Sequence, residues 1–170
     1  MQYPKLKIVI AGDFFAKIYE EIFAVRLKEL GHTVIRFKWG EYFKFLHHTK
    51  KDLLNISEVI LLFQNKFKFG PVIRKINRDL ISLCKNESPD LVIIYRATHV
   101  YASTIKELKA MGITVFSYNN DDPFSKSYPR YFWRHYIKAM HFYDFIFSYR
   151  SKNLIEYKEY GVENVTLLKA

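Results

Sequence analysis

The chain has 170 residues, of which 49% are hydrophobic and 18% aromatic, with a mean hydropathy of −0.14. This length and composition suit a folded globular domain and exclude an intrinsically disordered chain. No apolar run approaches the roughly 18 residues that a membrane-spanning helix needs, and the single Cys84 excludes an intrachain disulfide. The formal net charge of +10 favours polyanionic partners such as nucleic acid, anionic lipid or phosphate-bearing substrates.

The first half of the chain alternates apolar runs with helical patterns. A strand is predicted at residues 7–11, followed by a helix at 15–30 and a second strand at 33–38. The region 41–69 is the least regular part, and we expect one or two helices there. The helix predicted at 71–85 opens with a proline, which suits the first turn of a helix.

The second half continues the same alternation. Its first strand, predicted at residues 91–95, is apolar throughout, which is typical of a strand buried on both faces. Thr104 and Glu107 fit a capping box for a helix that ends near Gly112. The remaining predicted elements are a strand at 114–118, a helix at 129–142, a strand at 144–149, a short helix capped by Ser151 and a strand at 165–168.

This alternation predicts an α/β fold, namely a Rossmann-like three-layer sandwich with a mostly parallel sheet of about six strands. We expect the strand order 3-2-1-4-5-6. No internal linker interrupts the pattern, so residues 1–170 are predicted to form a single domain that folds by itself. Because the chain stops as the sixth predicted strand ends, we expect a further domain to follow it.

The most informative stretch is the polar segment 118–125, Tyr-Asn-Asn-Asp-Asp-Pro-Phe-Ser, which follows a predicted strand. Ligands of open α/β sheets bind in the crevice outside the carboxyl ends of the strands. The segment therefore places amides and carboxylates where a ligand is expected. Asn, Asp and Pro also dominate ordinary turns, so a turn without a binding role is the alternative.

Several side chains at this edge are candidates for chemistry. Asp121, Asp122 or His99 could act as a general base. The candidate substrate-binding residues, which also follow predicted strands, are Asp13, Arg96, Asn119, Asn120 and Arg150. Arginine is suited to bidentate binding of phosphate or carboxylate, and a salt bridge to a local carboxylate is the alternative role of both arginines.

Several familiar sites are absent from the sequence. There is no G-x-G-x-x-G fingerprint, no P-loop and no G-x-S-x-G elbow, which disfavours dinucleotide binding, P-loop chemistry and acyl hydrolysis. The histidines lack zinc-binding spacing, and the adjacent Asp121 and Asp122 point opposite ways in an extended chain. We therefore predict neither a metal site nor a cofactor.

The segment 128–138 interleaves basic and aromatic residues. It fits an interfacial membrane helix, a nucleic-acid surface, or a core helix whose Arg and Lys side chains reach water. If its basic residues share an exposed face with Tyr131 or Trp133, we expect modest, salt-sensitive binding to anionic vesicles. Burial of Phe132 and Trp133, with no apolar patch beside the bases, would argue against that.

Four blocks of the sequence resemble the N-terminal domain of GT-B glycosyltransferases, most closely the CgeB-like (spore maturation protein) group. The resemblance is carried by residues 89–96, Pro-Asp-Leu-Val-Ile-Ile-Tyr-Arg, and by residues 117–125. Residues 143–150 and 159–165 support it. The similarity covers most of the chain from Leu6 onward.

The resemblance implies a function. In such enzymes the N-terminal domain generally holds the acceptor and often supplies the base, and the C-terminal domain binds a nucleotide-sugar donor. The chain is thus expected to be the acceptor side of a cytoplasmic glycosyltransferase, with the donor domain absent and no transfer by this chain alone. The acceptor could be a glycan, a lipid-linked glycan or a protein, and the enzyme could sit peripherally at the anionic inner face of a membrane.

A different class of function also fits the composition. A non-catalytic basic α/β module could bind a polyanion, either nucleic acid or an anionic membrane surface, although nucleic acid is not the expected partner of the transferase. Basic groups that line the crevice at the strand ends would favour the transferase. A basic stripe away from the strand ends would favour the module.

Overall fold

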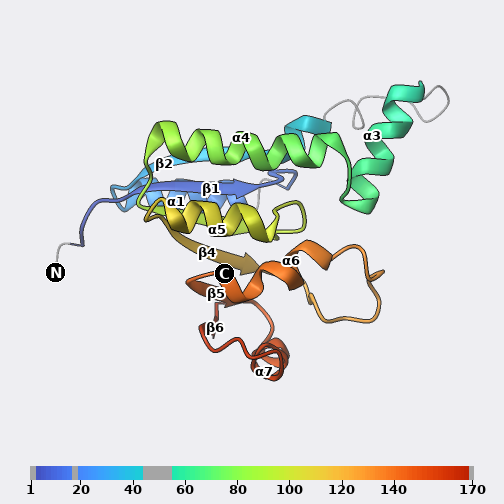
Figure 1. Ribbon diagram of the computed structural model, residues 1–170. Helices are drawn as coiled ribbons and strands as arrows, with labels where there is room; N and C mark the ends of the chain where they lie inside the picture. Colours follow the sequence, from blue (N-terminus) through green and yellow to red (C-terminus); the bar gives the residue numbers. More distant parts are fainter. Residues whose placement is uncertain (1–2, 17–18, 44–54, 169–170) are drawn as a thin grey trace.

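The computed structural model describes residues 3–16, 19–43 and 55–168 (Figure 1). The strands are β1 (Lys7–Gly12), β2 (Thr33–Lys38), β3 (Leu91–Tyr95), β4 (Thr114–Asn119), β5 (Phe145–Ser148) and β6 (Val165–Leu167). The helices are α1 (Glu20–Glu29), α3 (Ile56–Phe67), α4 (Pro71–Glu87), α5 (Ala102–Ala110), α6 (Arg134–Ala139) and α7 (Ser151–Glu159), with short 3-10 helices η1 (Trp39–Phe43) and η2 (Met140–Phe142).

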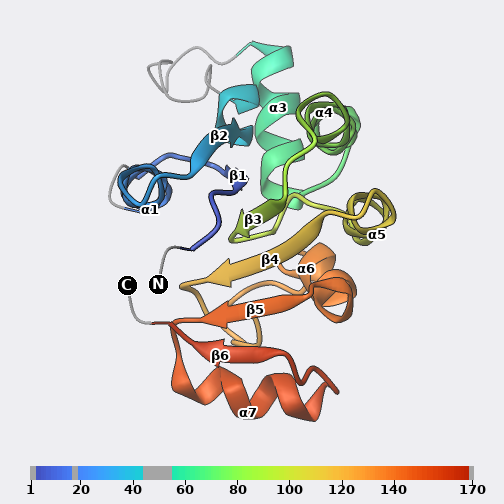
Figure 2. The ribbon, with the colours of Figure 1, turned by 90° about the vertical axis from the view of Figure 1, so that its left-hand side faces the viewer.

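The strands form one six-stranded sheet in which every neighbouring pair is parallel. Helix α1 covers one face of this sheet, and α4, α5 and α6 cover the other (Figure 2). This arrangement confirms the predicted α/β, Rossmann-like three-layer fold. Because all strands run the same way, their carboxyl ends meet at one edge, which is where the polar segment 118–125 begins.

The predicted strand order is wrong in one respect. The observed order is β2-β1-β3-β4-β5-β6, so β3 pairs with β1 and not with the far side of β2. Burial explains the difference: β3 is buried at all five positions, which suits a central strand, whereas Thr33 of β2 is exposed. The chain therefore winds in opposite directions from β1, and the switch point lies between β1 and β3.

Two apolar cores hold the layers together. The larger core lies between the sheet and the α4–α5–α6 layer and includes Leu80, Val92 and Val115. The smaller core lies beneath α1 and includes Ile10 and Ile93. Cys84 belongs to the larger core, and burial raises the pKa of its thiol to about 12.

Some helix boundaries differ from the sequence-based predictions. Helix α5 begins at Ala102, so the predicted capping box at Thr104 is wrong, and Thr104 is buried inside the helix. Ser151 is the first residue of α7, and its side chain does not cap that helix. The helix predicted at 129–142 is confined to α6 and η2, after a series of turns.

Helix α3 stands at the end of the molecule toward which β1 points (Figure 1). An Asn55 capping box starts it, with the Asn55 side chain accepting from Glu58 N and the Glu58 side chain accepting from Asn55 N. It occupies part of the region predicted to hold one or two helices, and residues 44–54 of that region lie outside the described residues. Over the described ranges, no helix combines the length and apolarity that crossing a bilayer requires.

Asn77 of α4 connects the helix layer to the loop after β3. Its amide nitrogen donates to the carbonyl oxygens of Ile73 and His99, both at 2.8 Å. Its amide oxygen accepts from the backbone nitrogen of Tyr101 at 2.8 Å and from the hydroxyl of Thr104 at 2.7 Å. Asn77 is buried, so these bonds fix the path of the loop from inside the protein.

We predict that Asn77→Leu strongly destabilises the domain. The substitution keeps the branching and the number of side-chain heavy atoms but leaves the His99 carbonyl, the Tyr101 amide and the Thr104 hydroxyl without their partner. Each buried polar group that loses its partner costs about 1–3 kcal/mol, so we expect a loss of roughly 3 kcal/mol or more in urea unfolding. The exposed neighbour Arg78 provides a control, because Arg78→Leu should change stability by no more than about 0.5 kcal/mol. Equal stability of the two variants would contradict this role of Asn77.

Candidate functional site

A cavity of about 730 Å³ opens at the carboxyl edge of the sheet, at the switch point between β1 and β3. We call it the strand-end cavity. Its walls come from the loops after the first three strands, from α3 and from the segment before α6. The lining residues are Asp13, Phe14, Phe15, Lys38, Trp39, Gly40, Glu41, Phe43, Asn65, Lys68, Arg96, Thr98, His99 and Phe132. Its position is where open α/β sheets bind ligands.

The backbone around this cavity is strained. Four non-glycine residues in the described part of the chain have positive φ, and three of them line the cavity: Phe14 (54°), Lys68 (51°) and Arg96 (49°). Phe14 lies two residues after the end of β1, Arg96 directly follows β3, and Lys68 is the C-cap of α3. Left-handed conformations of such residues cost about 1–3 kcal/mol each and cluster at functional sites.

Two glycines let the loops approach closely enough to form the cavity wall. A Cβ atom at Gly40 would clash with the carbonyl oxygen of Asp13, so the loops after β1 and β2 can touch only without that atom. A Cβ atom at Gly12 would clash with the carboxylate of Glu20. That carboxylate is buried and accepts from the Phe14 nitrogen at 3.4 Å, and burial raises its pKa.

The cavity is rich in positive charge. Lys38, Lys68 and Arg96 line it, together with the carboxylates of Asp13 and Glu41. Burial, together with the charge of Arg96 and against the opposing charge of Asp13, lowers the pKa of Lys68 to about 8. The Lys68 ammonium and the Arg96 guanidinium both lie over the Phe132 ring, at 5.2 and 5.4 Å from its centroid.

His99 forms the inner wall of the cavity. Its Nδ1 lies 3.1 Å from the Thr98 hydroxyl, and its Nε2 lies 3.0 Å from the Asn65 Oδ1 and 3.3 Å from the Lys68 Nζ. The ring also packs against the aromatic rings of Trp39 and Phe43. Burial, followed by the charge of Lys68, holds the pKa of His99 well below its usual value, so the imidazole is neutral near pH 7.

An ion pair separates this cavity from a second one. The Nε of Arg96 and the Oδ2 of Asp121 are 2.7 Å apart, in an ion pair rather than a linear hydrogen bond. Arg96 lines the strand-end cavity, and Asp121 lines a cavity of about 680 Å³ on the α1 side of the sheet. The pair therefore joins the ends of β3 and β4 and forms a boundary between the two spaces.

We call the second space the tyrosine groove. Its apolar lining includes tyrosines from α1 and from the ends of three strands, and Asn120, Asp121 and Arg150 supply polar groups. The tyrosines are Tyr19, Tyr95, Tyr118 and Tyr149. Successive rings are in contact, with centroid distances of 6.1 Å from Tyr19 to Tyr95 and 4.8 Å from Tyr95 to Tyr118. Burial raises the pKa of Tyr95 and Tyr118, so both phenols stay protonated and keep a donor.

The structure divides the predicted site residues into separate groups. The strand-end cavity contains Asp13, Arg96 and His99, and the tyrosine groove contains Asn120, Asp121 and Arg150. All of them lie at the carboxyl edge of the sheet.

Asn119 and Asp122 belong to neither space. Asn119 is fully buried, and its amide nitrogen donates to the Tyr157 hydroxyl at 3.3 Å. Asp122 accepts from the Phe124 nitrogen and the Asn153 side chain, at 3.0 and 2.8 Å, and lies 3.5 Å from the Lys152 Nζ. These contacts attach the 118–125 segment to α7, so Asp122 has a structural role.

Sequence reasoning missed several residues of the site. Lys68 ends a helix in a region whose pattern is irregular, and no local signal shows that its side chain turns inward. Lys38 ends β2 and Trp39 follows it at the same edge, but neither was among the predicted site residues. The tyrosines of the groove come from separate elements, and only the topology brings them together.

Comparison with known proteins adds no identification. No protein-family model and no curated protein matches this chain. Within the described ranges, no three side chains of the His, Cys, Asp and Glu types are grouped so that they could hold a metal ion.

We predict that His99 remains neutral in the folded protein well below pH 6.5. Since the unfolded chain binds more protons than the folded chain over that range, stability should fall as the pH drops below about 6.5. The partly buried His135 has a lowered pKa too, so His99→Asn should remove only part of this slope. Urea unfolding at pH 7, 6 and 5 measures it, with the exposed His141→Gln as control. A His99 ring resonance that titrates near pH 6.5 in the folded protein would contradict the prediction.

Proposed function

We propose that this chain is the acceptor-binding domain of a glycosyltransferase that moves a sugar from a nucleotide-sugar donor to an acceptor hydroxyl. The supporting observation is the cationic cavity at the switch point of a parallel sheet, lined by Lys38, Lys68 and Arg96. This is the arrangement that would favour a transferase over a module with a remote basic stripe. The four sequence blocks similar to GT-B N-terminal domains supply the reaction class.

Asp121 is the candidate base that the geometry favours. Its carboxylate lines the tyrosine groove, and the ion pair with Arg96 fixes its orientation. Asp122 is occupied by contacts to α7, and His99 is buried against Asn65 and Lys68. An acceptor hydroxyl held in the groove would lose its proton to Asp121 as it attacks the anomeric carbon of the donor.

The donor enters this proposal as a co-substrate. Among the described residues, the groups suited to a diphosphate would line only one side of a cleft between this domain and a donor domain. Orienting a departing diphosphate requires several fixed hydrogen-bond donors. We therefore assign most donor contacts to a second domain, and no metal or cofactor enters the proposed step. The 170-residue chain alone should bind nucleotide sugars weakly and release no nucleotide in response to an acceptor.

The competing function is a basic α/β module that binds a polyanion without catalysis. Exposed bases around α3 support its membrane variant, and no observed feature favours nucleic acid. Acceptor-dependent release of nucleotide by the protein that joins this domain to a donor domain would separate the two functions. A module would show binding to the polyanion and no release.

We predict that Asp121→Asn lowers the turnover of that complete transferase by about 10²–10⁴-fold, the usual contribution of a general base. The substitution removes the basic oxygen but keeps the size of the side chain. Turnover is measured as acceptor-dependent nucleotide release. Asp122→Asn is the matched control, because its contacts to Asn153 and Phe124 predict an effect on stability and little change in turnover of the folded enzyme. Normal turnover of Asp121→Asn would remove Asp121 from the chemistry.

We also propose that the domain associates peripherally with an anionic membrane surface. Helix α3 has an apolar stripe at positions 56, 59, 60, 63 and 67, the spacing of one helix face. Ile56, Val59, Ile60 and Phe63 of this stripe are 81, 51, 52 and 55% exposed. A large exposed apolar surface of this kind marks an interaction site.

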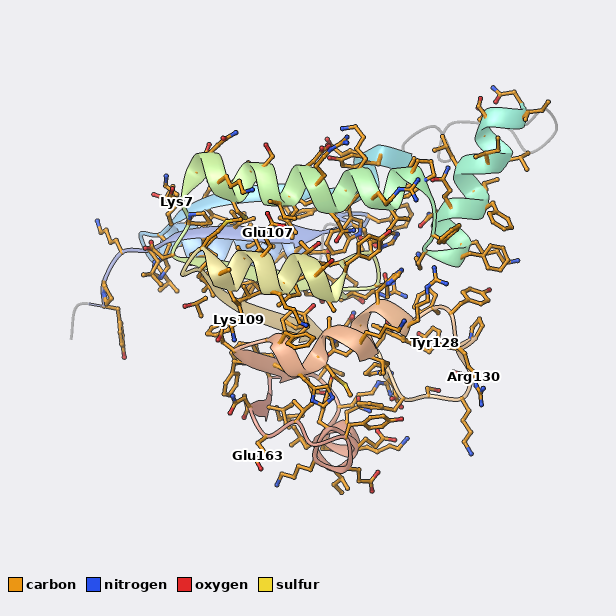
Figure 3. The ribbon with its side chains drawn as sticks, viewed as in Figure 1. Lys7, Glu107, Lys109, Tyr128, Arg130 and Glu163 are labelled. Carbon is orange, nitrogen blue, oxygen red and sulfur yellow. The ribbon has the colours of Figure 1, made fainter. Side chains whose placement is uncertain are left out.

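Positive charges lie near the C-terminal end of α3, beside this stripe. Lys66 lies 5.6 Å from the centroid of the Phe67 ring, and Arg134 lies 5.8 Å from that of Phe69. Figure 3 shows Arg130 at the end of the molecule where α3 stands, and Lys7 at the opposite end. Trp133 is buried and Phe132 is partly buried, so α3 supplies the apolar patch that the 128–138 segment lacks.

We predict that the chain binds vesicles containing phosphatidylglycerol, and that salt weakens this binding. The double substitution Ile60→Ser with Phe63→Ser should lower the partition coefficient at least about tenfold, since burying each such side chain contributes about 1.5–3 kcal/mol. Ile155→Ser on α7 is the control, because Ile155 is 65% exposed but lies away from α3. Unchanged partitioning of the double variant, or self-association through the stripe, would contradict the membrane proposal.

A further inference from the structure

The Lys68 ammonium lies inside the strand-end cavity and forms no ion pair with a described residue. The side chain is only 7% exposed, and its Nζ contacts the Asn65 Oδ1 at 3.1 Å and the His99 Nε2 at 3.3 Å. No carboxylate among the described residues lies within ion-pair distance of it. An ammonium taken out of water without a paired anion is costly, so a position that retains one is suited to an anionic ligand.

A second cation is positioned for the same ligand. Arg96 meets Asp121 through its Nε, which leaves its two terminal amino groups available for a bidentate contact. Both cations line the strand-end cavity and lie over the same ring, that of Phe132. Lys38, whose Nζ lies 5.3 Å from the centroid of the Phe14 ring, adds a third cation to the lining.

Besides these three cations, the lining contains two carboxylates and a histidine. Asp13 is the acid whose charge acts on Lys68, and one of its oxygens already accepts from the Phe15 nitrogen at 2.9 Å. Glu41 is the second carboxylate of the lining, and His99 is neutral near pH 7. Three cations thus face two carboxylates in the lining, and Asp121 of the tyrosine groove pairs with Arg96, so Lys68 is the buried cation that no described carboxylate pairs.

We infer that the strand-end cavity binds a phosphate group, with the Lys68 ammonium and the Arg96 guanidinium as its contacts. A phosphate monoester carries nearly two negative charges at pH 7 and three acceptor oxygens, which matches one compact ammonium and one planar guanidinium. The volume of about 730 Å³ leaves room for a sugar or nucleoside beside the phosphate, against Trp39 and Phe132. Phosphate binding itself does not depend on the proposed transferase function. Only the assignment of the phosphate to an acceptor or to a donor rests on that function.

The test is isothermal titration calorimetry of the 170-residue chain with glucose 1-phosphate, uridine diphosphate and glucose, in a buffer free of phosphate. Both phosphates should bind and glucose should not. Lys68→Met, which keeps an unbranched side chain and removes the ammonium, should weaken phosphate binding by about 10–100-fold, the range for a charge-assisted contact. Lys158→Met on α7 is the control, because Lys158 is exposed and distant from the cavity, and should change the affinity less than twofold.

The wild-type protein provides a second readout in case Lys68→Met does not fold. Because the ammonium loses its proton around pH 8, affinity for glucose 1-phosphate should fall as the pH rises from 7 to 9. The phosphate itself titrates near pH 6 and keeps its charge over that range. Absence of phosphate binding at millimolar concentration, or equal affinities in wild type and folded Lys68→Met, overturns the inference.

The outcomes separate this inference from the proposed function. Phosphate binding that depends on Lys68, together with no acceptor-dependent nucleotide release by the protein that joins this domain to a donor domain, supports the site and removes the transferase. Transferase activity of that joined protein, with no phosphate bound at Lys68, supports the transferase and removes the phosphate site. Tighter binding of glucose 1-phosphate than of uridine diphosphate supports the site and assigns it to a phosphorylated acceptor, and the opposite order supports it and assigns it to the donor.

Discussion

The position of β1 is the constraint on which the edge of this domain depends. β1 is buried between β2 and β3, and the chain leaves it in opposite directions along the sheet. The loops after β1 and β3 must therefore diverge, and side-chain packing alone does not fill the space between them. That space is the strand-end cavity, so its existence follows from the topology, and the sequence of the loops decides only what lines it.

The fold class could be predicted because its signals are local. Apolar runs of four or five residues, separated by helical patterns, define a parallel sheet covered on both faces, and this is what forms. The strand order depends instead on which strand is buried most deeply. β3 is buried at every position, whereas Thr33 of β2 is exposed, and this difference favours β3 as the strand beside β1. The sequence-based prediction followed the common Rossmann strand order instead.

The site was predicted in part for the same reason. Residues that follow strands, such as Asp13, Arg96 and Asp121, could be placed at the edge from the pattern alone. Their division between two cavities could not, because it depends on which side of the sheet each loop turns toward. Asp121 and Asp122 illustrate this dependence. They are adjacent in the chain and face different ways, so they contact different partners, Arg96 and Asn153. Lys68 reaches the cavity only through tertiary packing.

Arg96 brings these features together, because it is strained, charged and shared between two spaces. A left-handed arginine directly after a central strand would be replaced by glycine if stability alone mattered, since glycine adopts that conformation without cost. Its guanidinium instead neutralises Asp121 on the tyrosine-groove side and faces Lys68 on the other, where like charges oppose each other. Each feature costs stability in the unliganded chain, and an anion in the strand-end cavity would offset the repulsion. Backbone strain and like-charge repulsion gathered at a single residue of the switch point are thus better explained by ligand binding than by folding.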